Sequence, residues 1–137
     1  MKKIHISLVL IFVLASLLSS CHKDLRQRAV EEAKEYTRKY CPTPVDNCVR
    51  TDSTVFDLSS DTYIYYCTLT ERADDSLFVA MHHDEIAESL RQSIRQSINL
   101  QRYKKAGFSF RYVCHSEKNP AQILMDLGVS KDDYKQL

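Results

Sequence analysis

The feature that most restricts how this chain folds is an unbroken apolar run near its start, Leu8–Ala15. The run follows Lys2 and Lys3 and has the length of a secretory signal core, whereas a helix that spans a bilayer needs about 20 apolar residues. We therefore expect residues 1–20 to be a signal peptide. Its removal from the 137 residues leaves 117, so residues 21–137 are predicted to form one domain of ordinary size.

The end of the apolar run carries a second signal. Leu18-Ser19-Ser20-Cys21 resembles the lipobox of bacterial lipoproteins, in which a hydrophobic residue and two small residues precede an invariant cysteine. The resemblance implies cleavage between Ser20 and Cys21 and attachment of fatty acyl chains such as palmitate to Cys21. Two such chains anchor a protein stably, because each buried methylene contributes about 0.8 kcal/mol. An ordinary secretory signal with a chance cysteine, or a short uncleaved anchor, is the alternative interpretation.

Charge and composition restrict the partners. Lys2 and Lys3 leave with the signal, so 17 of the 19 Lys and Arg residues remain against 18 Asp and Glu. This balance argues against nucleic acid and acidic membrane surfaces as partners. Gly107 and Gly128 are the only glycines in the sequence, so a glycine-rich phosphate loop cannot be built and nucleotides are not expected as ligands. We predict no cofactor.

The first half of the mature chain predicts one helix and three strands. Apolar residues recur at helical spacing over residues 24–40, and Pro42 then stops the helix. Because this helix begins near Asp24, the tether after Cys21 is about three residues, or roughly 10 Å. Residues 49–57, 62–70 and 77–82 are rich in β-branched or aromatic residues and are predicted strands of an antiparallel meander.

The second half predicts a helix, a strand and a short terminal segment. Ile86, Leu90, Ile94 and Ile98 form a four-residue ladder that Asp84 is placed to cap, and Gly107 ends the helix. Residues 108–115 alternate as a last strand, and residues 121–127 are expected to form a short helix or an irregular edge. The fold class is α+β: an antiparallel sheet of about four strands packed against two helices, in the order α-β-β-β-α-β.

Four cysteines besides Cys21 are candidates for disulfide bonds in an exported protein. Cys41 and Cys48 bracket a short loop, whereas Cys67 and Cys114 lie on the aromatic faces of two predicted strands. A Cys67–Cys114 bridge is expected if those strands are neighbours. Free buried thiols are one alternative. A metal or redox site that combines Cys67 or Cys114 with His82, His83 or His115 is the other, but the chain lacks C-x-x-C and H-x-x-x-H spacing.

Other polar clusters favour structural roles over catalysis. His82-His83-Asp84-Glu85 and Asp74-Asp75 are expected to be a helix start and a solvated turn, so we predict no metal site. Tyr63, Tyr65, Tyr66 and Tyr112 suit packing within the sheet, with a binding face as the alternative. No serine, cysteine or lysine sits in a recognisable nucleophile setting such as that of G-x-S-x-G or S-x-x-K, and no catalytic residue is predicted.

The Leu18–Cys21 lipobox, the first helix and the two aromatic strands, Thr62–Tyr66 and Gly107–Val113, together resemble small uncharacterised lipoproteins common in the Bacteroidetes, a family of unknown function. The resemblance extends over nearly the whole chain and implies no activity. The element order is also compatible with a cystatin-like fold, which does not by itself carry a function.

These features favour a lipoprotein anchored to the envelope, in the outer membrane, through acylated Cys21. We expect it to be a non-enzymatic binding or accessory domain, with an envelope protein as its possible partner. The alternative is an immunity or inhibitor lipoprotein that blocks a toxin or a protease. A metal protein or enzyme that uses His82, His83 or a cysteine is the third hypothesis.

Overall fold

The computed structural model describes residues 25–135 of the chain. The predicted signal peptide and Cys21 therefore lie outside the described residues. Four strands form one sheet in the order β1-β2-β3-β4. Their bounds are Val49–Asp57 for β1, Thr62–Leu69 for β2, Ser109–Ser116 for β3 and Ile123–Val129 for β4. The predicted α+β class is confirmed.

The strand pairing makes this a mixed sheet, because β2 and β3 are parallel whereas β1–β2 and β3–β4 are antiparallel. The prediction of a purely antiparallel sheet was therefore wrong. The error came from residues 77–82, which were expected to form a strand that follows β2. They belong to α2 (Ser76–Met81), where the Asp75 side chain caps the helix by accepting a hydrogen bond from Phe78 N at 2.7 Å.

The long connection from β2 to β3 contains the helices that lie between these two strands in the sequence. A 3-10 turn, η1 (Glu71–Ala73), leads to α2, then to α3 (His83–Gln96) and α4 (Gln101–Ala106). The predicted second helix is thus broken at residues 97–100, and Ile98 leaves the apolar ladder and is 83 % exposed. The predicted cap was also wrong: α3 begins after His82, and Asp84 lies inside its first turn. Gly107 ends α4 as expected, at a φ of 81°.

The last strand, β4, occupies residues that were expected to form a helix or an irregular edge. Met125, Leu127 and Val129 are buried and alternate with exposed Asp126 and Gly128, which is the pattern of a strand with one face on the core. A short helix, α5 (Lys131–Lys135), follows. Its Tyr134 hydroxyl donates to Phe108 O at 2.8 Å and ties α5 to the start of β3.

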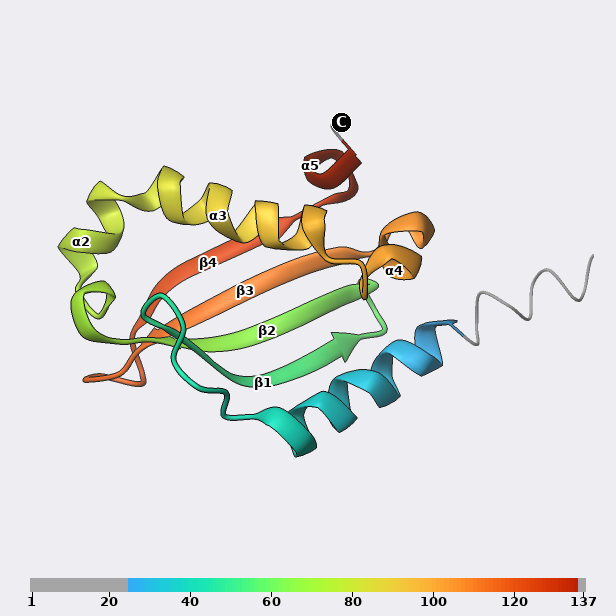
Figure 1. Ribbon diagram of the computed structural model, residues 1–137, viewed down its shortest axis with the longest axis horizontal. Helices are drawn as coiled ribbons and strands as arrows, with labels where there is room; N and C mark the ends of the chain where they lie inside the picture. The colour runs from blue at the N-terminus through green and yellow to red at the C-terminus, as the bar shows by residue number, and fades with distance from the viewer. Residues whose placement is uncertain (1–24, 136–137) are drawn as a thin grey trace, which may run out of the picture.

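One face of the sheet carries the hydrophobic core. Helix 25–40 lies beside β1, and α3 lies on the side of β3 and β4 (Figure 1). Ala29 and Ala33 are the buried positions of helix 25–40, and Ala87 and Ile94 are those of α3. The sheet contributes aromatic, aliphatic and cysteine side chains to this core: Phe56, Tyr63, Cys67, Leu69, Phe110, Tyr112, Cys114, Met125, Leu127 and Val129.

Two threonines hold helix 25–40 against β1. The Thr54 hydroxyl, which is 3 % exposed, donates to Ala33 O at 2.8 Å. The Thr37 hydroxyl accepts from Thr54 N at 2.8 Å. Small alanines on the helix allow this close approach, and the two bonds fix the distance between the helix and the sheet. Among the described helices, none is long and apolar enough to cross a membrane.

Candidate functional site

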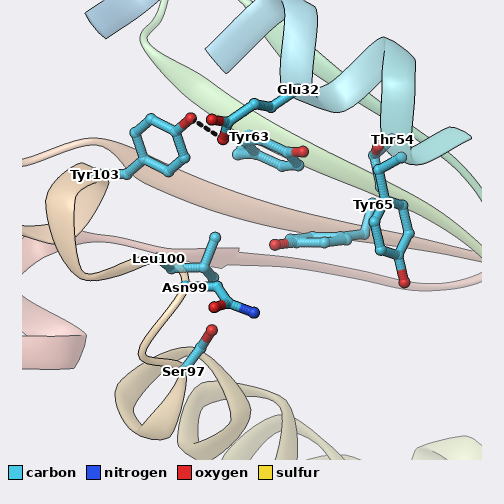
Figure 2. Close-up of a pocket in the computed structure, with 9 residues that line it drawn as sticks. Glu32, Thr54, Tyr63, Tyr65, Ser97, Asn99, Leu100 and Tyr103 are labelled. Carbon is cyan, nitrogen blue, oxygen red and sulfur yellow. Dashed lines mark hydrogen bonds between the residues drawn. The ribbon is translucent and has the colours of Figure 1, made fainter. Parts of the chain in front are cut away.

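A cavity of about 270 Å³ opens between helix 25–40, the sheet and the α3–α4 linker (Figure 2). We call it the tyrosine cup. Its lining residues come from three separate parts of the chain: Glu32, Tyr36, Thr54, Tyr63, Tyr65, Ser97, Asn99, Leu100 and Tyr103. The cup forms because Tyr63 and Tyr65 of β2 lie on the helix-covered face and the two covering helices leave a space between them above these rings.

A carboxylate, Glu32, forms one wall of the cup. It accepts hydrogen bonds from the Tyr103 hydroxyl, drawn in Figure 2, and from Arg102. Arg102 also places its guanidinium 5.2 Å from the centre of the Tyr103 ring. Because Arg102 balances the Glu32 charge, the wall is polar without excess negative charge.

The tyrosine hydroxyls of the cup stay protonated at neutral pH. Burial raises the pKa of Tyr103, and the hydrogen bond to Glu32 raises it further. Burial also raises the pKa of Tyr63, Tyr65 and Tyr36. Each of these side chains therefore offers a neutral phenol that both donates and accepts hydrogen bonds.

The linker residues Ser97 and Asn99 face the tyrosines across the open space, as Figure 2 shows. Within the described part of the chain, no hydrogen bond joins either side chain to another residue. An amide and a hydroxyl that face a cavity without protein partners are available to a bound molecule. The cup thus combines an aromatic floor with free polar groups, a composition typical of recognition surfaces.

A second hollow, of about 480 Å³, lies where β1 and β2 meet α2 and α3. Its apolar lining includes Leu69, Phe78, Ile86 and Leu90, and His82 and Glu85 lie at its rim. The His82 and His83 rings contact the neighbouring carboxylates of Glu85 and Asp84, at 3.4 and 3.1 Å. All four are solvent-accessible, and these two pairs bring together no converging set of ligands.

The structure brings one predicted cysteine pair together. Cys67 and Cys114 are register partners on β2 and β3, and each is 1 % exposed. Both are free thiols. A hydrogen bond from the Cys114 thiol lowers the pKa of Cys67, and the same bond together with burial raises the pKa of Cys114. Their oxidation to a disulfide remains a prediction.

The other predicted cysteine pair is also unbonded. Cys41 and Cys48 are partly buried free thiols. The Cys48 thiol donates to Glu71 Oε2 at 3.7 Å, and the pKa of Cys41 is raised by burial and by Asp52. A Cys41–Cys48 disulfide stays a prediction, as does the acylation of Cys21, which lies outside the described residues.

One polar residue differs from its predicted role. Asp74 was expected in a solvated turn, but it is 6 % exposed and accepts hydrogen bonds from the Ser116 hydroxyl and from Lys118 N at 3.0 Å. These bonds join η1 to the end of β3. Asp75, the next residue in the sequence, is exposed and caps α2.

Sequence patterns identified only part of the cup. The tyrosines of β2 were marked as a packing face or a binding face, and Tyr63 and Tyr65 both pack in the sheet and line the cup. Glu32, Ser97, Asn99 and Tyr103 were missed. Glu32 and Tyr36 are four residues apart beside the buried Ala29–Ala33 stripe, and this spacing is the signal that could have placed them at the rim of a helix-covered site.

A family model described as "Domain of unknown function (DUF8479)" matches residues 24–125 of the chain. This match covers both helices that flank the cup and all its lining residues. No curated protein sequence matches the chain.

Three solved structures share the fold. One is a protein of Pseudomonas aeruginosa described as secreted, with 14 % identity over 81 % of this chain and 93 % of that one, at a TM-score of 0.67. The second is AspS, a pilotin of the type II secretion system of Vibrio cholerae, with 13 % identity over 85 % and 97 % of the chains, at 0.62. The third is EpsS, a type 2 secretion pilotin of Vibrio vulnificus, with 8 % identity over 84 % and 96 %, at 0.63.

Proposed function

The chain belongs to the family described as "Domain of unknown function (DUF8479)", and this description names no activity. From the site itself, we propose that the protein is a non-enzymatic accessory lipoprotein. It is anchored to the bacterial cell envelope through acylated Cys21 and binds a polypeptide partner at the tyrosine cup. The observation that carries the proposal is the cup: tyrosines lie beside an amide, Asn99, and a hydroxyl, Ser97, that have no hydrogen-bond partner among the described residues.

The chemistry of the cup supports recognition over catalysis. Among the described residues, no cysteine, histidine or lysine lines the cup, and the Glu32 carboxylate is already engaged by Tyr103 and Arg102. Tyrosine is enriched at protein interfaces because it combines a large apolar area with a polar tip. A volume of about 270 Å³ is below the range typical of small-molecule sites, about 300–1,000 Å³, and suits the insertion of one or two side chains of a partner.

The fold and the leader support the cellular setting. Two of the proteins with this fold are pilotins of secretion systems. The lipobox-like Leu18–Cys21 segment and the apolar run before it are the basis for proposing the lipid anchor, and the resemblance of nearly the whole sequence to small Bacteroidetes lipoproteins agrees with it.

The experiment is site-specific photocrosslinking of the full chain in its own bacterium. A benzophenone amino acid replaces Tyr36 or Asn99, at the rim of the cup, and in a matched control replaces Val55, which is 46 % exposed on the other face of β1. We expect the Tyr36 and Asn99 probes to capture the same envelope protein and the Val55 probe to capture none. Equal labelling from Val55, or no product from either rim position in membrane-bound protein, would contradict the proposal.

A further inference from the structure

One end of the domain gathers the start of helix 25–40, the β1–β2 turn, α4 and α5, all at the right of Figure 1. Several contacts join these segments. Arg26 pairs with Asp61 of the turn at 2.6 Å. Ser109 N, just after α4, donates to Asp61 O at 3.0 Å. The described chain therefore begins at this end, and the proposed lipid on Cys21 lies only a few residues before it in the sequence.

The same end carries a concentration of positive charge that the near-neutral total hides. The basic patch consists of Lys104, Lys105, Lys131 and Lys135 on α4 and α5. None of these four ammonium groups forms an ion pair within the described residues. Asp132 is the exposed acid beside them, whereas Asp133 is held by Ser130 N at 2.7 Å. Two further cations at this end are paired, Arg26 with Asp61 and Arg102 with Glu32. The Asp57 carboxylate of the turn accepts hydrogen bonds from Ser59 and Ser60.

Two lysines of the patch are neighbours on α5, beside the exposed Asp132. Lys131 and Lys135 are one helical turn apart, and their contact lowers the pKa of Lys135. A bound anionic group would relieve this repulsion, as phosphate groups do between neighbouring lysines.

An apolar side chain accompanies the basic patch. Ile98, in the α3–α4 linker, is 83 % exposed and lines a shallow hollow together with Lys104, Lys105 and Lys135. A large aliphatic side chain amid lysines is the composition of surfaces that rest on lipid, where the charges meet headgroups and the apolar group enters the interface.

We propose that the basic patch and Ile98 form a membrane-facing surface that docks this end of the domain onto anionic phospholipid headgroups. The proposal rests on the lipid anchor proposed above, because a tether of about 10 Å after Cys21 holds this end near the bilayer. The two features then act together: the acyl chains keep the protein on the membrane, and the patch fixes which way the domain faces.

The chain contains no tryptophan, which allows a clean optical test. The full-length lipidated protein with Ile98→Trp is reconstituted into vesicles that carry bromine on their acyl chains. The vesicles are of phosphatidylcholine alone or with roughly one third phosphatidylglycerol. In anionic vesicles we expect the emission of the introduced indole to shift to shorter wavelength and to lose most of its intensity. Salt at about 1 M should reverse both effects because it screens the lysines.

Matched variants test whether the quenching depends on the charge of the patch and on the position of the indole. In the Ile98→Trp background, Lys105→Glu, Lys131→Glu and Lys135→Glu together should abolish the quenching, whereas Lys34→Glu, Lys39→Glu and Arg72→Glu should leave it unchanged. A separate Met81→Trp variant carries its indole in α2 at the opposite end, where Met81 is 73 % exposed, and should not be quenched. Lys104 is left intact because its ammonium donates to Ile94 O and Arg95 O at the end of α3.

Equal quenching in the Ile98→Trp and Met81→Trp proteins, or quenching that persists after charge reversal of the patch, would overturn the inference. Intact mass at Cys21 is measured on the same samples. If the Ile98→Trp protein is acylated but its emission stays unquenched, the proposed anchor is supported and the proposed docking surface is refuted. A chain without acyl groups refutes the anchor itself.

Discussion

Two buried thiols meet at the centre of the sheet. Cys67 and Cys114 share a register position on parallel strands, and adjacent strands keep paired Cα atoms within the range that a disulfide spans. We predict that the exported protein contains a Cys67–Cys114 disulfide. Because the bridge closes a long loop, it should add about 4 kcal/mol to the free energy of unfolding.

Peptide mass spectrometry under non-reducing conditions measures this bond directly. Cys41→Ser with Cys48→Ser is the matched control and should leave the Cys67–Cys114 crosslink intact. Four alkylated thiols in protein purified from the envelope would contradict the prediction.

The buried carboxylate of Asp74 is one of several carboxyl groups that make stability depend on pH. Hydrogen bonds, first from Ser116, lower the pKa of Asp74 below its usual value near 3.8. Its contribution is therefore complete above the pKa of the unfolded chain and is lost as the pH falls through the lower pKa of the folded state. We predict a melting temperature that drops below about pH 4, with a smaller drop in Asp74→Asn. Thermal unfolding from pH 7 to pH 2 checks this, and identical slopes for both proteins would disprove the role of Asp74.

At the scale of single elements, helix 25–40 depends on its small residues. Ala33 is 1 % exposed, and its carbonyl accepts the Thr54 hydroxyl. Ala33→Asp would bury a charge against β1 and should lower the free energy of unfolding by several kcal/mol, about 3 or more. Lys34→Asp, one residue along and exposed, should change it by less than about 0.5 kcal/mol. Urea unfolding of both variants tests this prediction. Equal unfolding midpoints for the two variants would mean that Ala33 does not pack against the sheet.

The elements also show what local patterns can and cannot predict. Helix 25–40, β1 and β2 match their predicted ranges because proline, turn residues and clear periodicity bound them. Residues 77–82 were wrongly predicted as a strand because a short run such as Leu-Phe-Val-Ala-Met fits either a strand or a helix, and only the Asp75 cap distinguishes the two. The strand β4 was missed for the related reason that Gly128 and the nearby proline weaken its signal.

At the scale of the whole molecule, the non-local features could not be predicted. The parallel pairing of β2 and β3 joins segments about 47 positions apart, as Cys67 and Cys114 show, and nothing in either strand specifies its direction relative to the other. The tyrosine cup is assembled from helix 25–40, the sheet and residues 97–103. Its tyrosines were visible in the sequence, but its shape depends on where two helices cross the sheet.

The total charge of the molecule and the arrangement of its charges are separate properties. A mature total near zero argued against acidic membranes as partners, yet the total does not report how charges are arranged. Folding places four lysines on α4 and α5, so lysine side chains are concentrated at one end of a nearly neutral domain. Electrostatic attraction to a surface depends on this local density more than on the sum.

The break between α3 and α4 has a thermodynamic consequence. Ser97, Asn99 and Leu100 line the cup, whereas Ile98, between them, projects into the basic patch. If lipid contact and partner binding both favour the same conformation of this four-residue linker, the two events are energetically coupled. Coupling of this kind is reciprocal: a membrane that strengthens partner binding by a given factor is itself bound more tightly, by the same factor, when the partner is present. The linker would then make the domain a sensor that binds its partner best once it is seated on the bilayer.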